Sequence, residues 1–145
     1  MKRTFTGLVV LVFLSGCQDA TSEVAESPEP TMTVMELMVT VMAPATDTLW
    51  GIDDPQTDAD WQVFVDAANV VILAGETIKA GGTGPNDNKW ASDAAWDAFA
   101  DTLIGAAIDA REAANNKDIE AMYTAGEVLY PPCEECHIQF NPGVQ

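Results

Sequence analysis

The sequence predicts an all-α fold, arranged as an antiparallel up-down four-helix bundle. In four long stretches, apolar residues recur at intervals of three and four, the spacing of one face of an α-helix. No stretch alternates apolar and polar residues for long, so no β-strand is expected. Short polar turns separate the stretches, and such turns join helices that lie antiparallel to each other.

Length and charge limit the possible functions. The chain has 145 residues, with 6 Lys and Arg against 23 Asp and Glu, and that length allows one domain with a sizeable core. The acidic excess disfavours nucleic acid and anionic membrane surfaces as partners, because both repel it. The same charge favours docking to a basic partner protein.

Residues 1–16 are expected to be a signal peptide. Two cations near the start precede an apolar stretch over residues 5–14 that is too short to span a bilayer. The sequence LSGC, which ends at Cys17, resembles the lipobox of bacterial lipoproteins, so Cys17 is the predicted lipidation site. The alternative is ordinary cleavage near Gly16, which would leave Cys17 as a free thiol.

The segment 17–30 is expected to combine the lipidated cysteine with a flexible acidic tether, because it is polar, acidic and contains proline. Thirteen extended residues reach about 40 Å at about 3.3 Å each. Gln18 follows the cysteine, which in lipoprotein sorting signals favours the outer membrane over the inner. The expected location is therefore the periplasm, with the domain at 31–145 held to a bacterial membrane by lipid.

The first helix is predicted from Thr33 to Trp50. Thr33 and Glu36 have the spacing of a capping box, in which each side chain bonds a free backbone N–H group. Pro44 cannot donate to the carbonyl of Thr40, so a kink is expected there. Three methionines of this helix are predicted to share one stripe: Met35, Met38 and Met42.

The second helix is predicted from the Thr57 cap to about Lys79, and the third from about Trp90 to Asn115, with the glycine-rich loop 81–88 between them. The inward residues of the second helix are predicted to be Trp61, Phe64, Val65, Ala68, Val71, Ile72, Gly75 and Ile78. Those of the third helix are predicted to be Trp96, Phe99, Leu103, Ala107 and either Ile104 or Ile108.

The fourth helix is predicted to start near Lys117 or Asp118. Its apolar pattern consists of Ile119, Met122, Tyr123, Gly126, Leu129 and Tyr130. Pro131 and Pro132 follow. Two prolines remove two backbone donors and clash with the preceding turn, so we expect the helix to break at Tyr130 and a separate short helix to follow.

The sequence Cys133-Glu134-Glu135-Cys136-His137 has the Cys-x-x-Cys-His pattern that attaches c-type haem. Residues i, i+3 and i+4 of a helix share one face, so the two thiols and the imidazole are expected to point the same way. The thiols would bond the two vinyl groups of the porphyrin, and the imidazole would reach the iron. The predicted cofactor is one covalent haem c per chain.

Three other interpretations of this motif were weighed. A thioredoxin-like dithiol should lie beside a β-strand, and none is predicted. A structural zinc site needs four ligands, and the motif supplies three unless a carboxylate joins them. A plain disulfide between Cys133 and Cys136 would leave the neighbouring His137 unexplained.

A helical bundle with Cys-x-x-Cys-His near its C-terminus resembles the class II c-type cytochromes, the cytochrome c prime group, over about residues 33–142. In the class I cytochromes the motif lies near the N-terminus instead. The resemblance implies covalent haem on Cys133 and Cys136, His137 as the proximal axial ligand, and a distal face formed by the first helix. Some members carry a distal methionine and transfer electrons, whereas others leave the iron open and bind small gases.

His137 is the only histidine, so a strong sixth protein ligand must be methionine or, less favourably, lysine. Met38 is the predicted ligand because it is central in its stripe. The alternative is that the methionines are core residues and that the open iron binds nitric oxide or carbon monoxide.

The expected function is that of a one-electron carrier, not an enzyme, with a basic redox protein as partner and a homodimer as a further possibility from the family. The haem would bring two propionates. Its possible cationic partners, for which surface solvation is the alternative, are Lys79, Lys89, Arg111 and Lys117.

Overall fold

The computed structural model describes residues 30–141 and 143, and the regular secondary structure in this part of the chain is all helical, with no strand. The predicted all-α class is therefore confirmed. The signal peptide, Cys17 and nearly all of the tether lie outside the described residues. In chain order, the elements are α1 (Val34–Leu37), a π-helical turn η1 (Met38–Met42), α2 (Ala43–Trp50), α3 (Asp58–Lys79), α4 (Asp87–Trp90), α5 (Ala94–Asn116) and α6 (Ile119–Phe140).

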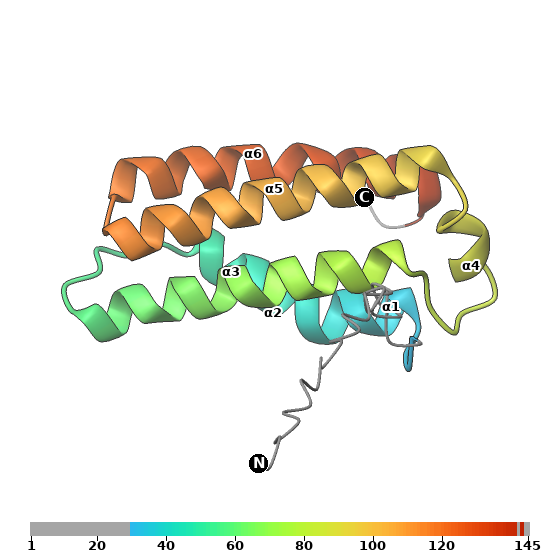
Figure 1. The fold of residues 1–145 in the computed structure, drawn as a ribbon, viewed down its shortest axis with the longest axis horizontal. Coiled ribbons are helices and arrows are strands. Elements are labelled where there is room, and N and C mark those ends of the chain that lie inside the picture. Colours follow the sequence, from blue (N-terminus) through green and yellow to red (C-terminus); the bar gives the residue numbers. More distant parts are fainter. Residues whose placement is uncertain (1–29, 142, 144–145) are drawn as a thin grey trace, which may run out of the picture.

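α5 lies beside α6, and α3 lies beside α2 (Figure 1). The elements α1, η1 and α2 follow one another without a break and form the first helical segment. α3 packs along α5, α5 packs along α6, and α2 contacts both α3 and α6. Two of these helices approach closely at Gly75, where an added Cβ atom would lie 2.6 Å from Cγ1 of Ile104 on α5. The glycine therefore allows α3 and α5 to pack together.

Side-chain caps set the helix starts. Thr33 Oγ1 accepts the Glu36 N–H at 3.1 Å and the Glu36 carboxylate accepts the Thr33 N–H at 2.9 Å, so the predicted capping box is confirmed. The third long helix was predicted to begin near Trp90 but begins at Ala94. The reason is Asp93, whose carboxylate accepts the Ala95 N–H at 2.9 Å and starts α5 after the separate short helix α4.

The predicted break at Tyr130 is wrong. α6 continues to Phe140 with Pro131 and Pro132 inside it. The two prolines withhold helical N–H donors from the carbonyl groups four residues earlier. Those groups belong to Glu127 and Val128, both exposed residues, so water can take the place of the missing donors. The Cys-x-x-Cys-His motif therefore lies on the same helix as Leu129, which is fully buried.

The inward pattern of α6 is only partly as predicted. Met122 and Leu129 are buried, whereas Tyr123 and Tyr130 are 51% and 54% exposed. The two tyrosines therefore lie on the surface of the helix rather than in the core.

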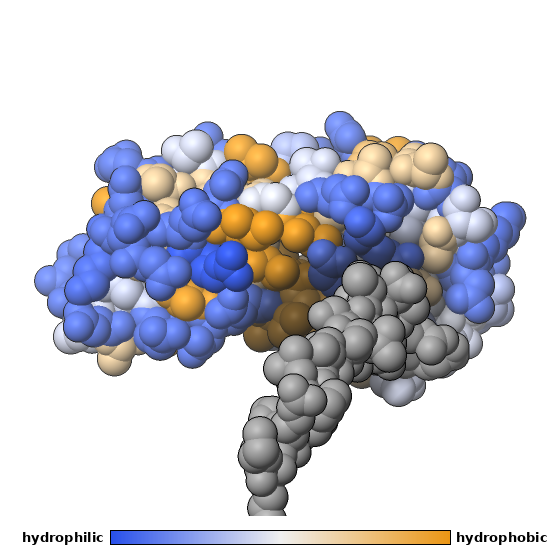
Figure 2. Space-filling model, viewed as in Figure 1, coloured by the Kyte–Doolittle hydropathy of each residue, from blue (hydrophilic) through white to orange (hydrophobic). Residues whose placement is uncertain are grey.

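The face of the molecule on which α3 lies is not uniformly polar. Figure 2 shows apolar surface across the middle of this face, bordered by hydrophilic side chains. α3 is also long and apolar enough to cross a membrane by length and composition, but half of that stretch is buried inside the fold. The core helix of a folded domain has the same properties.

Candidate functional site

The predicted site residues meet at one cavity of about 390 Å³, which lies between the first helical segment, the start of α5 and the end of α6. That volume is within the range of about 300 to 1,000 Å³ that cofactor and ligand sites occupy. Most of the walls are apolar. The lining residues are Met38, Val39, Met42, Ala43, Thr46, Asp47, Trp50, Ile78, Trp96, Phe99, Ala100, Leu103, Pro132, Cys133, Cys136 and His137.

α6 supplies the Cys-x-x-Cys-His side of the cavity. Cys133, Cys136 and His137 all line it, as residues at i, i+3 and i+4 of one helix should. Both thiols are free, and the Cys133 Sγ donates a hydrogen bond to the Leu129 carbonyl at 3.3 Å. This side of the site is brought together as predicted.

Burial changes the pKa of both thiols in the motif. Burial raises the pKa of the Cys133 thiol, and burial together with the neighbouring Cys133 raises the pKa of Cys136 to about 11. Redox-active dithiols in Cys-x-x-Cys motifs have a lowered pKa instead. These thiols are therefore protonated at neutral pH, which is unfavourable for a dithiol redox protein.

The first helical segment supplies the methionine side. Met38 and Met42 line the cavity, and Met42 is only 4% exposed. Met35 does not line the cavity and is 68% exposed. The prediction of a single stripe is therefore wrong for Met35.

The π turn explains this difference. Within it the Ala43 N–H bonds the Met38 carbonyl, five residues earlier. The buried residues Leu37 and Met42 are consequently five residues apart instead of three or four. Pro44 follows directly and cannot donate to Thr40. The expected disturbance at Pro44 thus takes the form of a π turn, a feature often found at functional sites.

A buried carboxylate holds the start of this helical segment. Asp87 is 4% exposed, and its Oδ2 accepts the Val34 N–H at 2.9 Å and the Gly84 N–H at 2.8 Å. An added Cβ atom at Gly82 or Gly84 would lie 2.4 or 2.7 Å from the same oxygen. Sequence reasoning found the glycine-rich loop but missed Asp87. The signal for it was a single acidic residue that follows three closely spaced glycines.

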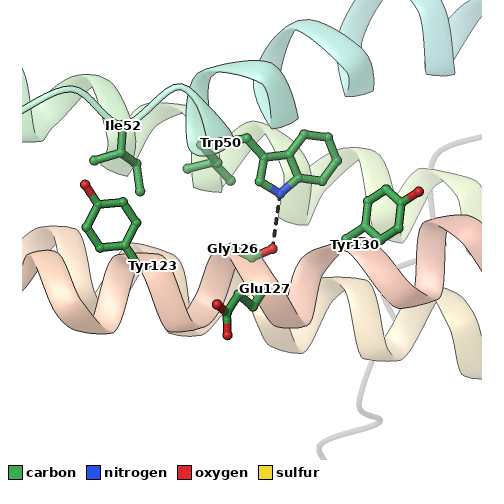
Figure 3. Close-up of a pocket in the computed structure, with 7 residues that line it drawn as sticks. Trp50, Ile52, Tyr123, Gly126, Glu127 and Tyr130 are labelled. Atoms are coloured by element: carbon green, nitrogen blue, oxygen red, sulfur yellow. Dashed lines mark hydrogen bonds between the residues drawn. The ribbon is translucent and has the colours of Figure 1, made fainter.

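A side-chain hydrogen bond holds the C-terminal end of the first helical segment. The Trp50 indole N–H donates to the Gly126 carbonyl on α6 at 3.1 Å, as Figure 3 shows. The segment that carries Met38 is therefore bonded to Asp87 of α4 at one end and to α6 at the other. These two contacts fix Met38 relative to the motif on α6.

Aromatic side chains form another part of the wall. Trp96 is 2% exposed and donates its indole N–H to the Ile78 carbonyl at 2.9 Å. It stacks on Trp90, with ring centroids 5.6 Å apart, and meets Phe140 edge-on at 5.1 Å. Phe140 thus packs on aromatic side chains of which Trp96 and Phe99 line the cavity.

No Lys or Arg is among the residues that line the cavity. Lys79 bonds Asp97 and Asp101, Lys117 bonds Asp58, and Arg111 donates to Asn69. These three candidate partners of the propionates already have partners in the protein, and their pairing with haem stays a prediction.

Within residues 30–141 and 143, no three His, Cys, Asp or Glu side chains are grouped so that they could hold a metal ion. The fourth ligand that a structural zinc site needs is therefore not found beside the motif in this part of the chain. No family model, curated protein or solved structure matches the chain.

Proposed function

We propose that this protein is a monohaem c-type cytochrome that acts as a one-electron carrier, built as an antiparallel up-down four-helix bundle of the cytochrome c prime kind. One observation carries the proposal: Met38 on the first helical segment and Cys133, Cys136 and His137 on α6 line the same apolar cavity. The donor set fits a covalently attached haem, because two free thiols, an imidazole and a thioether face one space with few polar walls.

Each of these residues has a separate proposed role. The Sγ atoms of Cys133 and Cys136 would hold the haem to α6 through two thioether bonds, each made by adding an S–H across a vinyl group. His137 would supply an imidazole nitrogen to the iron, and Met38 would supply a thioether sulfur. When bound, haem supplies reversible one-electron oxidation and reduction of iron. A Met/His pair raises the potential, and the apolar walls exclude water.

Absorption spectra of the haem-loaded protein, oxidised and reduced, test this assignment. We expect the weak methionine-to-iron charge-transfer band at the red end of the oxidised spectrum. The band should disappear in Met38→Ala and persist in Met35→Ala, a matched control whose side chain is 68% exposed. If the band is missing in the unaltered protein and carbon monoxide shifts the reduced spectrum, the distal position is open and the gas-binding alternative replaces the electron carrier.

The covalent attachment of haem to Cys133 and Cys136 is tested separately. The denatured protein should keep its haem, as measured by mass spectrometry. The double variant Cys133→Ser/Cys136→Ser should lose it, because no thiol remains in the motif. Haem that stays with the denatured double variant would contradict attachment at these two residues.

The N-terminal segment completes the proposal. Residues 1–16 act as a signal peptide and Cys17 carries the lipid, which places the protein in the periplasm on a membrane, with the outer membrane favoured. Cys17→Ser should move the protein from the membrane fraction to the soluble fraction, and Cys133→Ser should leave it in the membrane fraction. Membrane retention of Cys17→Ser would contradict the anchor.

A further inference from the structure

A stripe of alternating tyrosines and glutamates runs along the outside of α6. The residues of this Tyr–Glu stripe are Glu120, Tyr123, Glu127, Tyr130 and Glu134. They are spaced by three and four residues, so they share one face of the helix. All five are exposed. Because α6 does not break at its two prolines, the stripe is continuous and ends inside the Cys-x-x-Cys-His motif.

A surface hollow of about 370 Å³ lies beside the stripe, between the end of α2 and α6, and is lined by Leu49, Trp50, Ile52, Tyr123, Gly126, Glu127 and Tyr130. Figure 3 shows Trp50 above α6 between Tyr123 and Tyr130, with the Glu127 carboxylate directed away from the indole. The Trp50 and Tyr130 rings meet edge-on with centroids 6.2 Å apart. Trp50 is 42% exposed.

Trp50 also lines the cavity that holds the site residues. Trp50 is therefore common to the walls of the surface hollow and of the proposed haem cavity. Electron transfer between two proteins requires their cofactors to come close, and a partner seated on this hollow would meet that requirement.

Negative charge predominates around the stripe. α6 has four glutamates and no Lys or Arg, and the first helical segment has Glu36 and Asp47 and no cation. The turn that follows α2 adds Asp53 and Asp54, whereas Lys117, just before α6, is paired with Asp58. This surface therefore favours a positively charged ligand.

The geometry points to the Tyr–Glu stripe and its hollow as the docking surface for a basic protein that exchanges electrons with this chain, an inference that rests on the proposed function. Lys and Arg side chains bind the faces of tyrosine and tryptophan rings and pair with the carboxylates between them. Partly exposed tyrosine and tryptophan are also the residues that dominate binding at protein interfaces.

Charge argues against two other occupants. A second copy carries the same net charge of −17, and residues 18–30 contain four acidic residues and no basic one. Both would be repelled by this surface at low ionic strength.

The test uses the haem-loaded full chain and, as probe, a class I cytochrome c of high isoelectric point. Its dissociation constant is measured by interferometry, and electron exchange by stopped-flow absorption, each at low and high salt. Glu127→Gln and Tyr123→Ser alter the stripe. Glu76→Gln and Leu73→Ser are matched controls on α3, where both residues are exposed.

At low salt each stripe variant should raise the dissociation constant by about three- to tenfold and slow electron exchange correspondingly, since interface aromatic residues and steering charges have effects of this size. The two controls should change the dissociation constant by less than about twofold. The increase caused by Glu127→Gln should become smaller at high salt.

Equal weakening by Glu76→Gln would overturn the inference, because the binding would then depend only on net charge. Unchanged binding in both stripe variants would also overturn it. So would a dimer, seen by analytical ultracentrifugation, that the stripe variants dissociate. Stripe-dependent binding by a chain that takes up no haem would uphold the docking surface and overturn the proposed function alone.

Discussion

Asp87 connects two parts of the molecule through one carboxylate. It is one of two buried polar or charged residues in the described part of the chain, the other being Thr46. Its oxygen accepts N–H groups from Val34 at the start of α1 and from Gly84 in the α3–α4 loop. Without it, both donors would be left without this partner, one of them at the start of the segment that carries Met38.

Asp87→Ala should lower the free energy of unfolding by at least about 1 to 3 kcal/mol, because the buried Val34 N–H loses its partner and the loss at the part-buried Gly84 N–H adds to this. Urea denaturation followed by circular dichroism measures this. Asp109→Ala, at an exposed position, should stay within about 0.5 kcal/mol of the unaltered protein. A loss at Asp87 no larger than that of the control would show that the two bonds do not contribute to stability.

Gly75 and Gly105 form a natural pair for comparison. A Cβ at Gly75 would lie 2.6 Å from Ile104 Cγ1, whereas at Gly105 it would meet no atom within 4 Å. Gly75→Ala should therefore destabilise the protein by about 1 to 3 kcal/mol through overpacking. Gly105→Ala should stabilise it by about 0.5 to 1 kcal/mol, because alanine favours the helix. Shifts of the same sign in urea denaturation would contradict this account of the α3–α5 contact.

At the scale of elements, the irregular part of the first helical segment is the π turn beside the cavity. The π turn brings Met42 to the cavity that Met38 also lines, whereas Met35 lies outside it. Helix periodicity assumes 3.6 residues per turn throughout, so it could predict the helix and Pro44 but not the change of phase between Leu37 and Met42. The motif on α6 was predictable because its spacing lies within one regular turn.

Pro44→Ala restores an N–H group at position 44 that can bond the Thr40 carbonyl. The π turn should then relax toward regular α-helix and turn Met38 relative to the cavity. In the haem-loaded protein, the methionine-to-iron band should weaken. Pro55→Ala, in the loop after α2, is the control and should leave the band unchanged. An unaltered band in Pro44→Ala would show that the proline does not maintain the turn.

The continuity of α6 was the other element that sequence reasoning missed. Two adjacent prolines usually end a helix, and nothing in the sequence alone shows that the carbonyl groups of Glu127 and Val128 lie in exposed residues. Burial decides this question, and burial becomes known only when α6 is seen packed against α5.

For the whole molecule, charge sets the dependence on pH and salt. Hydrogen bonds from the Thr33 N–H and the Thr57 N–H lower the pKa of Glu36 and Asp60, and the Lys117 ammonium lowers the pKa of Asp58. A carboxylate whose pKa is lower in the folded state stabilises that state above its ordinary pKa, and the contribution is lost as pH falls through the lowered value. The net charge of −17 acts in the opposite direction, because its repulsion decreases when carboxylates take up protons.

Thermal unfolding should therefore show maximum stability on the acid side of neutrality and a decline at still lower pH, as the pH falls through the lowered pKa values of the capping carboxylates and they take up protons. Added sodium chloride should stabilise the protein at pH 7 by screening its repulsion. Asp60→Asn should reduce the decline in acid, and Asp66→Asn, which replaces another exposed carboxylate of α3, should not. A protein destabilised by salt at pH 7 would contradict the role given to net charge.

The π turn also sets the number of residues between the two ends of the first helical segment. The buried residues of this segment are Val34, Leu37, Met42, Ala45, Thr46 and Leu49, and the single gap of five lies between Leu37 and Met42. A helix with one residue fewer at that point would have gaps of no more than four along its whole length. The π turn thus accommodates one residue more than a regular α-helix with this core would, and it does so in the wall of the cavity that Met38 and Met42 line.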